Sequence, residues 1–227
     1  MLPRRSQSRN QALTLVDVVV LLAMVTLLAA LLLPALAAAK RKAQRINCVN
    51  NLEQIGQAYR IWAAYNFDQY PLWATNNPHG SIELMRKGVP DSQLALWNFM
   101  IMSNELATSK ILHCPADPNS TKADDFTNNF SSANISYFAS LDASFYYPQM
   151  ILSGDDNLLV DGSPVQPGIL NIATNSTVAW TNERHRNCGN IGMADCSTMQ
   201  VSSAGLQQAL SNAAASTTNT FNRFAIP

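Results

Sequence analysis

Four cysteines are the side chains of this 227-residue chain best suited to bonding chemistry, and they stand at positions 48, 114, 188 and 196. Zinc motifs commonly bring sulfur and nitrogen ligands together at short spacings such as C-x-x-C or H-x-x-x-H, and neither spacing occurs here. His113 with Cys114 and His185 with Cys188 supply suitable atoms, but without that spacing we predict no metal site. Four cysteines also allow three disulfide pairings, and their number alone does not choose between them.

A second cluster of polar ligands is the run Asp155-Asp156-Asn157, which is followed by Asp161. Calcium binds carboxylate and amide oxygens, so these three aspartates are candidate ligands for Ca²⁺. The spacing does not match a calcium-binding helix–loop–helix motif, and the same polar run is typical of a solvated turn. We therefore expect no required cofactor, with Ca²⁺ as the one ion that these residues suit.

Motifs for catalysis are absent from the sequence. It contains no G-x-S-x-G around a nucleophilic serine, no phosphate-binding loop and no G-x-G-x-x-G dinucleotide motif. His185 stands between Arg184 and Arg186, whose positive charges disfavour protonation of the imidazole, and we expect it in a surface loop. The sequence therefore predicts a structural or binding protein and not an enzyme.

Charge is distributed unevenly along the chain. The 15 basic and 15 acidic residues cancel, which excludes a generally basic nucleic-acid-binding protein, so no nucleic acid is expected as a partner. Residues 1–45 carry seven basic side chains and one acidic side chain, for a charge of +6, whereas residues 46–227 carry a charge of −6. A basic, apolar end joined to a mildly acidic body indicates a membrane segment or a processing signal.

The elements that must position these residues begin with a long apolar helix. Residues 18–39 are a run of 22 residues without a charge. As a helix this run spans roughly 33 Å, which is enough to cross the hydrocarbon core of a bilayer. A secretory signal peptide is the alternative, with three arginines in the first nine residues as its basic region and a small-residue cleavage site at 37–39. The run is longer than a usual signal core and Asp17 stands at its start, so we predict a membrane-spanning helix.

Beyond the apolar run the helix is predicted to continue, because no proline occurs between Pro34 and Pro71. Apolar residues recur there at steps of three and four, and they are Ile46, Val49, Leu52, Ile55, Tyr59 and Trp62. This spacing places them in one stripe of an amphipathic helix. We expect a single helix from about residue 14 to residue 66, whose first half spans the membrane and whose second half packs its stripe on the rest of the chain.

The remainder of the chain is predicted to form an α+β head. Turn-forming residues are frequent after Pro71, and we expect a helix from Ser92 to Thr108, a surface loop over 117–134 and a short helix over 204–212. Short strands are expected at 135–141, 149–152, 158–160, 177–180, 190–194 and 197–201. The last two would pair as a hairpin through a turn at Asp195-Cys196. The predicted fold class is therefore α+β, a long N-terminal helix packed on a small antiparallel sheet.

The beginning of the chain resembles the cleavage and methylation segment of type IV prepilins and type II secretion pseudopilins. In that family a basic leader ends at a glycine and is followed by F-T-L-I-E and a long apolar helix. Here the leader ends at Ala12 and is followed by L-T-L-V-D at residues 13–17, and Pro34 stands where many pilin helices carry a kink-forming proline. Further segments resemble one subgroup of pseudopilin-like proteins, and they are residues 30–59, K-I-L-H-C-P-A-D at 110–117, G-N-I-G-M-A-D at 189–195 and N-R-F-A-I-P at 222–227.

The resemblance implies a processing and assembly route. Prepilin peptidase would cut between Ala12 and Leu13, and the new N-terminus would be methylated. Asp17 and Pro34 would then act in assembly. Ala12, Leu13 and Asp17 replace the glycine, phenylalanine and glutamate of the family pattern, and each keeps the chemical character of the residue it replaces. The expected organisation is a leader (1–12), a transmembrane half of the helix (13–39), an amphipathic half (40–66) and an extracytoplasmic head (67–227).

The resemblance also implies a location and partners. The chain would cross the inner membrane once, with its N-terminus in the cytoplasm and its head in the periplasm, and would enter an extracytoplasmic filament after assembly. Its partners would be other pilin-like subunits, prepilin peptidase, an inner-membrane assembly platform and membrane lipid. The expected function is a structural subunit of a type II secretion pseudopilus or a type IV pilus-like filament. The alternative is a membrane-anchored extracytoplasmic binding module that does not polymerise.

An extracytoplasmic head permits disulfide bonds. Cys48 lies on the emerging helix and Cys114 follows a strand-like run, so this pair is a candidate bridge between helix and head. Cys188 and Cys196 flank a segment of seven residues, which in an extended strand would hold their Cα atoms roughly 20 Å apart. Free buried thiols are the remaining alternative.

Overall fold

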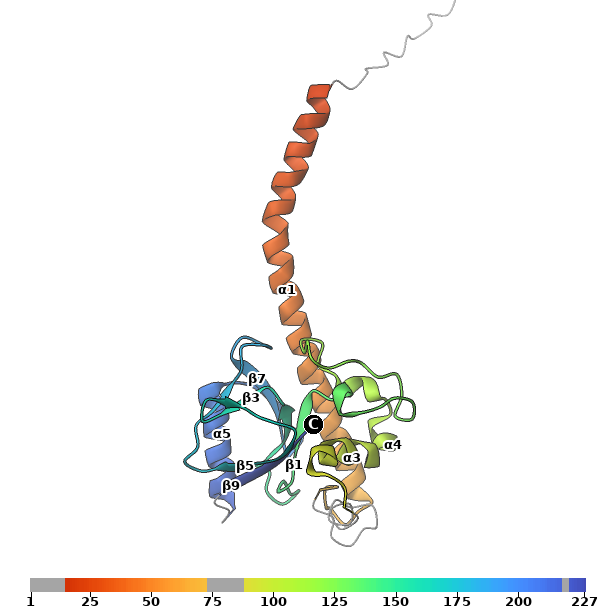
Figure 1. Cartoon of the computed structure of the whole chain (residues 1–227), viewed down its shortest axis with the longest axis vertical. Helices are drawn as coiled ribbons and strands as arrows, with labels where there is room; N and C mark the ends of the chain where they lie inside the picture. Colours follow the sequence, from red (N-terminus) through yellow and green to blue (C-terminus); the bar gives the residue numbers. More distant parts are fainter. Residues whose placement is uncertain (1–14, 73–87, 218–220) are drawn as a thin grey trace, which may run out of the picture. The chain divides into compact units, whose positions relative to one another are not determined.

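The computed structural model describes residues 15–72, 88–217 and 221–227. Contacts within the chain divide it into two units, residues 1–42 and 43–227, and the boundary falls inside helix α1 (Leu15–Ala64). The described part of the first unit is the start of α1, and the second unit contains the end of α1 together with the head (Figure 1). The predicted leader, 1–12, and Leu13 lie outside the described residues.

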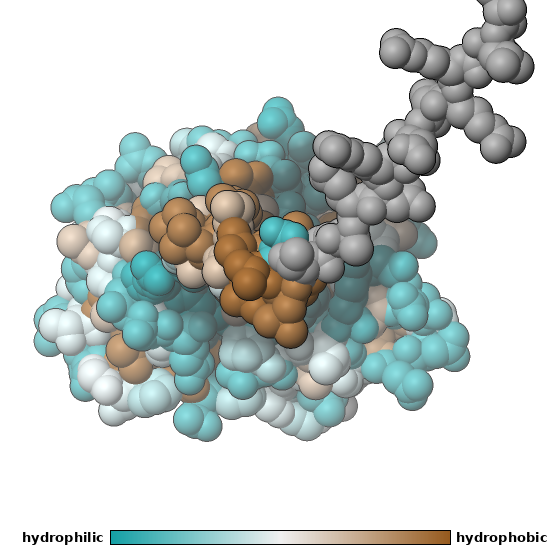
Figure 2. All heavy atoms as spheres, turned by 90° about the horizontal axis from the view of Figure 1, so that it is seen from above, coloured by the Kyte–Doolittle hydropathy of each residue, from teal (hydrophilic) through white to brown (hydrophobic). Residues whose placement is uncertain are grey.

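Helix α1 confirms the long helix that the sequence predicts. It extends over 50 residues and continues through Pro34. All residues from Leu15 to Ala43 are exposed, although most of them are apolar, and this helix is long and apolar enough to cross a membrane. Figure 2 shows brown apolar side chains gathered in one group with paler ones among them, whereas the rest of the surface on view is mostly teal and white. The same length and composition also suit a signal sequence, so the helix is a candidate membrane anchor or signal segment.

The second part of α1 buries one face. The buried apolar residues recur at helical spacing, and the largest are Leu52, Ile55, Tyr59 and Trp62. The predicted stripe is therefore confirmed over these positions. The predicted stripe is wrong at Ile46, whose side chain is 46% exposed. Full burial of the helix begins only at Cys48.

Six strands form the larger sheet of the head, in the order β5-β9-β1-β2-β7-β8. Their bounds are β1 (Tyr137–Ser140), β2 (Ile151–Asp155), β5 (Gly168–Ala173), β7 (Cys188–Met193), β8 (Thr198–Ser202) and β9 (Phe221–Ile226). A smaller sheet has the order β4-β3-β6, with β3 (Leu158–Val160), β4 (Ser163–Pro164) and β6 (Val178–Trp180). All of these strand pairings are antiparallel, which confirms the predicted α+β class.

The strands β1, β2 and β7 of the larger sheet are buried on both faces. Successive side chains of a strand point to opposite faces, and in β1 Tyr137 and Ala139 enter the core cluster that contains the α1 stripe. Phe138, between them, enters a second cluster with Leu206 and Leu210 of helix α5 (Ser203–Ser216). The head therefore has three layers, with α1 and α3 (Leu94–Ile101) on one side of the sheet and α5 on the other (Figure 1).

The helical segment predicted from Ser92 to Thr108 is divided. It consists of the 3₁₀ turn η1 (Asp91–Gln93), α3, α4 (Ser103–Leu106) and, beyond it, the turn η2 (Ser109–Leu112). Met102 interrupts the helix at φ −92° and ψ 18°, and Ala107 ends α4 with a left-handed φ of 60°. The prediction of one helix was therefore wrong, because a broad apolar face does not reveal these two backbone breaks.

The predicted hairpin at the end of the sheet is confirmed. β7 pairs with β8 in the register Gly189 with Val201, and the intervening turn places Cys196 at a φ of +69°. The turn contacts α1 at Gly56, where a Cβ atom would lie only 3.3 Å from the Cα of Cys196. The Cys196 thiol donates to the carbonyl oxygen of Gly56. A glycine inside α1 lowers its helix propensity, and here it permits this close approach.

Candidate functional site

The first candidate site is the apolar start of α1. Asp17 lies in the first turn of the helix, and Pro34 lies within it. Proline has no backbone N–H, so the helix loses one internal hydrogen bond at this position. The proposed cleavage residues Ala12 and Leu13 lie outside the described part of the chain. Chemically, this segment offers a carboxylate at the end of an apolar surface that has no covering in the described structure.

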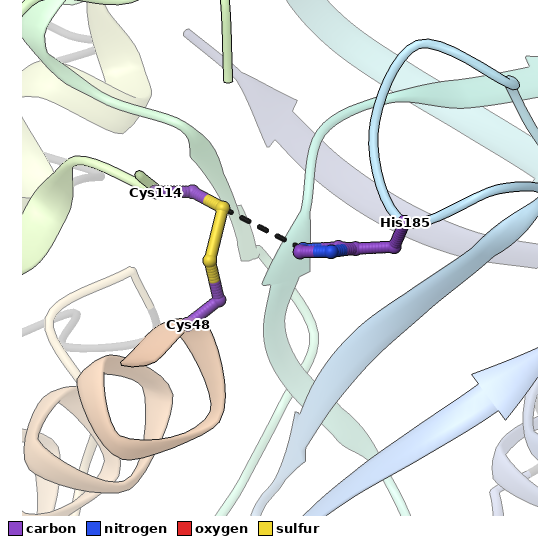
Figure 3. A group of neighbouring side chains, drawn as sticks. All are labelled: Cys48, Cys114 and His185. Carbon is purple, nitrogen blue, oxygen red and sulfur yellow. Dashed lines mark hydrogen bonds between the residues drawn. A yellow bond between two sulfur atoms is a disulfide. The ribbon is translucent and has the colours of Figure 1, made fainter. Parts of the chain in front are cut away.

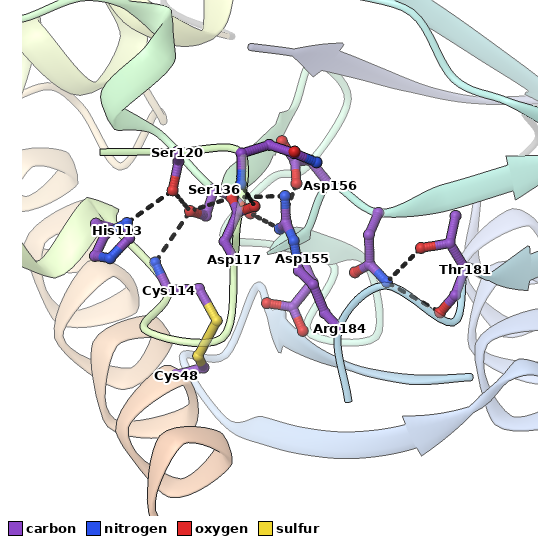
Figure 4. A network of polar contacts seen from close by, with 12 residues as sticks. Cys48, His113, Cys114, Asp117, Ser120, Ser136, Asp155, Asp156, Thr181 and Arg184 are labelled. Atoms are coloured by element: carbon purple, nitrogen blue, oxygen red, sulfur yellow. Dashed lines mark hydrogen bonds and ion pairs between the residues drawn. A yellow bond between two sulfur atoms is a disulfide. The ribbon is translucent and has the colours of Figure 1, made fainter. Parts of the chain in front are cut away.

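The second candidate site is a buried ionic cluster in the head, centred on Arg184 (Figure 4). One terminal nitrogen of its guanidinium, Nη2, lies 2.7 Å from Asp117 Oδ2, and the other, Nη1, pairs with Asp156 Oδ1. Nη1 also donates to the backbone oxygen of Ser136 at 3.0 Å. The Ser136 hydroxyl in turn donates to Asp117 at 2.7 Å. The side chains of Arg184 and Asp117 are 5% and 1% exposed, so this is an ion pair withdrawn from water.

This cluster corrects two expectations. The segment from Asp117 to Asn134 contains only the 3₁₀ turn η3 (Ser132–Asn134), as expected for a loop, but Asp117 and Asn134 are buried. The loop predicted around His185 is present, and residues 182, 183, 186 and 187 in it are exposed. Arg184 is buried, however, and the His185 side chain is only 2% exposed, so these two side chains point inward from the loop. The physical reason is the attraction of Arg184 to two buried carboxylates, which draws this turn inward.

The structure does not bring the three candidate calcium ligands together. Asp156 pairs with Arg184, and Asp155 Oδ2 accepts from the backbone N–H and the side chain of Asn190. Asp161 is exposed and accepts from the backbone N–H and the hydroxyl of Thr177, so it closes a turn. The sequence leaves two interpretations of residues 155–161, a calcium site and a solvated turn. Asp161 lies in such a turn, whereas Asp155 and Asp156 belong to the buried cluster.

Asp155 and His185 have strongly shifted pKa values. Burial raises the pKa of Asp155 to about 7, against the lowering effect of Arg184 and of the hydrogen bonds from Asn190. Burial also lowers the pKa of His185 to about 4, with smaller contributions from the positive charges of Arg45 and Arg184. The direction predicted for His185 is confirmed, although burial contributes more than the neighbouring arginines. His185 Nε2 lies 3.7 Å from Asp155 Oδ2, so the two groups share one buried environment.

The two shifts compensate each other in the pH dependence of stability. Between about pH 4 and 6.5 the folded pair holds one proton, on Asp155, and the unfolded pair also holds one, on His185. In His185→Gln the titrating histidine is removed, so only the raised pKa of Asp155 makes stability depend on pH. The stability that this group contributes is fully present below pH 3.8 and is lost as the pH rises through about 7. Relative to the parent, the variant should therefore lose stability steadily as the pH rises across this interval. Urea unfolding at several pH values measures this, and parallel pH profiles for the two proteins would contradict it.

Two of the four cysteines form a disulfide, and the other two are free thiols. Cys48 of α1 and Cys114, which follows η2, form a disulfide with a Cα–Cα distance of 5.3 Å, whereas Cys188 and Cys196 are free. His185 lies against this bridge, with Nε2 3.6 Å from Cys114 Sγ (Figure 3). Cys114 also donates its backbone N–H to the Ser136 hydroxyl, which links the bridge to the ionic cluster. The bridge and the cluster therefore form one continuous buried site that fastens α1 to the head.

A cavity of about 570 Å³ opens beside this site, and Asp117, Asp156 and Arg184 contribute to its lining. Arg184 is already engaged by two carboxylates, so it has little capacity left to hold an anionic ligand. The geometry accordingly indicates a structural role for the Arg184 cluster. At its edge His113 Nδ1 lies 2.7 Å from the Ser120 hydroxyl, which in turn lies 2.7 Å from the Ser136 hydroxyl.

Comparison of the chain with protein families, with curated proteins and with solved structures finds no match. Function therefore has to be inferred from the chain itself. The sequence did not reveal that Asp117, Asp156 and Arg184 converge, because they come from three distant segments. No spacing signal in the sequence joins these three residues.

Proposed function

We propose that this protein is a structural pilin-like or pseudopilin subunit, anchored in a membrane by the first part of α1 and assembled through that helix into a filament or pseudopilus. The observation that carries this proposal is the exposure of every residue from Leu15 to Ala43 in a predominantly apolar helix. Such a surface is stable only where lipid or other apolar helices cover it. Lipid would cover it before assembly, and the corresponding helices of neighbouring subunits would cover it afterwards.

In this proposal, the carboxylate of Asp17 would fix how far neighbouring helices are shifted along one another in the filament. A carboxylate costs on the order of 2.5–3.5 kcal/mol at the bilayer centre and less near the interface, so a charge within an apolar layer is a candidate for function. Cleavage after Ala12 would create an α-amino group at Leu13, four residues before Asp17. The amino group of an incoming subunit would pair with Asp17 in the same low-dielectric layer, where the attraction between opposite charges is strong.

The head supports the same proposal. A disulfide between Cys48 and Cys114 suits an oxidising compartment outside the cytoplasm. The bridge and the Arg184 cluster hold the end of α1 rigidly against the sheet, which would let a head follow its helix as one body during assembly. The resemblance of residues 12–17 to prepilin cleavage segments agrees with this arrangement.

Substitution of Asp17 tests the proposal. Asp17→Ala should leave the head folded and the helix inserted but should strongly reduce assembly, because it removes the partner of the new amino terminus. The matched control is Asp17→Glu, which restores the same charge on a longer side chain and should retain or improve assembly. The measurement is the ratio of sheared filament, or of crosslinked oligomer, to membrane-held subunit.

Equal assembly of Asp17→Ala and the parent would remove Asp17 from the mechanism. Absence of the parent protein itself from every sheared or crosslinked fraction, with the chain fully inserted, would contradict polymerisation and favour the anchored binding module.

A further inference from the structure

Three potential metal ligands converge where α1 meets the head. The sulfur atoms of Cys48 and Cys114 and a ring nitrogen of His185 all lie within 4.8 Å of one another, and they are the one such group of three in the described part of the chain (Figure 3). The two cysteines are 66 positions apart and His185 is 71 positions beyond Cys114. These three residues form no short spacing motif in the sequence, which explains why the sequence predicts no metal site.

We propose that the reduced form of this chain binds Zn²⁺ at this place, with Cys48, Cys114 and His185 as three ligands. The carboxylate of Asp155, next to His185, would reach the fourth position by moving toward the sulfur atoms. Zinc–sulfur bonds of about 2.3 Å and zinc–nitrogen bonds of about 2.0 Å place tetrahedral ligand atoms roughly 3.5 Å apart. Cys114 Sγ and His185 Nε2 are separated by 3.6 Å, and His185 Nε2 and Asp155 Oδ2 by 3.7 Å. The distance between Cys114 Sγ and His185 Nε2 already has the length that a tetrahedral zinc site requires. The two sulfur atoms are bonded to each other and would separate only on reduction, and Asp155 would have to approach them.

Asp155 contributes a second, independent observation. Its side chain is fully buried, and Oδ2 receives both hydrogen bonds from Asn190. Oδ1 is buried and has no hydrogen-bond partner among the described residues. Buried polar atoms are nearly always paired, so an unpaired carboxylate oxygen beside three soft ligands indicates a missing partner. Oδ2 is the oxygen next to His185 Nε2, so a small movement of the carboxyl group toward the sulfur atoms would be needed to bring Oδ1 to the metal.

The charges around the site suit a zinc complex. Two thiolates, one carboxylate and a neutral imidazole carry a charge of about −3, which Zn²⁺ reduces to about −1. Arg45 and Arg184 lie close enough to lower the pKa of His185, and their positive charges would balance the remaining negative charge. The same arginines favour the neutral imidazole, which is the form that binds a metal.

Disulfide formation and zinc binding exclude each other at this place. A dithiol reductant breaks the Cys48–Cys114 bond, gives two electrons and two protons to the sulfur atoms, and becomes a cyclic disulfide. Binding of Zn²⁺ then forms two zinc–sulfur bonds and releases the two thiol protons to the solvent. The bridge and the ion are thus alternative ways of joining α1 to the head, and this inference does not depend on filament assembly.

The test uses the full chain in detergent, carrying Cys188→Ala and Cys196→Ala so that no other thiol binds metal. After reduction and removal of the dithiol, the protein should bind about one Zn²⁺ per chain, and the oxidised protein should bind little. Cd²⁺ should give a thiolate charge-transfer absorption, and Zn²⁺ should slow alkylation of Cys48 and Cys114. His185→Gln should weaken zinc binding by at least about 10-fold, whereas the control His113→Gln should match the parent.

Three outcomes would overturn the inference. One is a reduced, folded chain that binds no Zn²⁺. Another is a chain that unfolds on reduction and is not refolded by Zn²⁺. The third is equal zinc affinity of His185→Gln and His113→Gln, which would place the metal elsewhere.

Discussion

Replacing Arg184 by alanine should lower the free energy of unfolding of the head by about 3–5 kcal/mol, because it leaves two buried carboxylates without their counter-charge. Arg186→Ala is the matched control, since Arg186 is exposed and lies two positions away in the same turn. Its effect should stay within about 0.5 kcal/mol. Urea unfolding of the two variants and the parent at neutral pH gives the comparison.

The loss in Arg184→Ala should also depend on its partners. Removing a second charge with Asp156→Asn relieves part of the repulsion between Asp117 and Asp156, so the double variant should be more stable than the sum of the single effects implies. Strictly additive effects, or equal stability of Arg184→Ala and Arg186→Ala, would contradict the role given to this cluster.

Removing the disulfide should have an effect of similar size. The bridge joins residues separated by 66 positions, and closing a loop of that length in the unfolded chain corresponds to about 4 kcal/mol of stability. Cys48→Ala with Cys114→Ala should therefore unfold at much lower urea concentration than the parent. Cys188→Ala with Cys196→Ala is the matched control, since these thiols are free and only half-buried, and it should change stability much less.

Chemical reduction provides a second measurement of the same bridge. A reductant should destabilise the parent by about the amount lost in the Cys48 and Cys114 double variant, and it should leave that variant unchanged. Four reactive thiols in denatured, unreduced parent protein would show that the bridge does not form.

The long helix could be predicted from the sequence because its signals are local. An uncharged run of 22 residues and a stripe at three- and four-residue steps each indicate a helix without reference to the rest of the chain. The hairpin β7–β8 was found for the same reason, since its two strands are adjacent and its turn lies at Asp195-Cys196. The strand predicted at 158–160 likewise coincides with β3.

Strands β5 and β9 were missed because their evidence is not local. β9 is a six-residue tail segment in which Asn222 is buried and Phe221 is exposed, so its hydropathy does not alternate cleanly. Its position between β5 and β1 depends on pairing with segments far away in the sequence. A short run such as β5 also has no period that distinguishes a strand from a loop.

The residues of the candidate site also divide into those that could be predicted from the sequence and those that could not. Cys48 and Cys114 could be proposed as a pair because one lies on the helix and the other on the head. The sequence predicts a surface loop around His185, which stands between Arg184 and Arg186, and it gives no sign that Arg184 and His185 are buried. Only the three-dimensional contacts show that Asp117 and Asp156 compensate Arg184, since burial of a charge depends on partners that sequence spacing does not reveal.

Mass analysis of the N-terminus tests the proposed function most directly. If the proposed function holds, protein isolated from membranes and from sheared filaments should lack residues 1–12 and begin at Leu13, with the mass of one added methyl group, because the proposed route has the apolar helix enter assembly after the basic leader is removed. The sheared fraction should contain this mature form alone. Recovery only of chains that begin at Met1 would contradict processing, and chains that begin at Lys40 would show that residues 1–39 are an ordinary signal peptide.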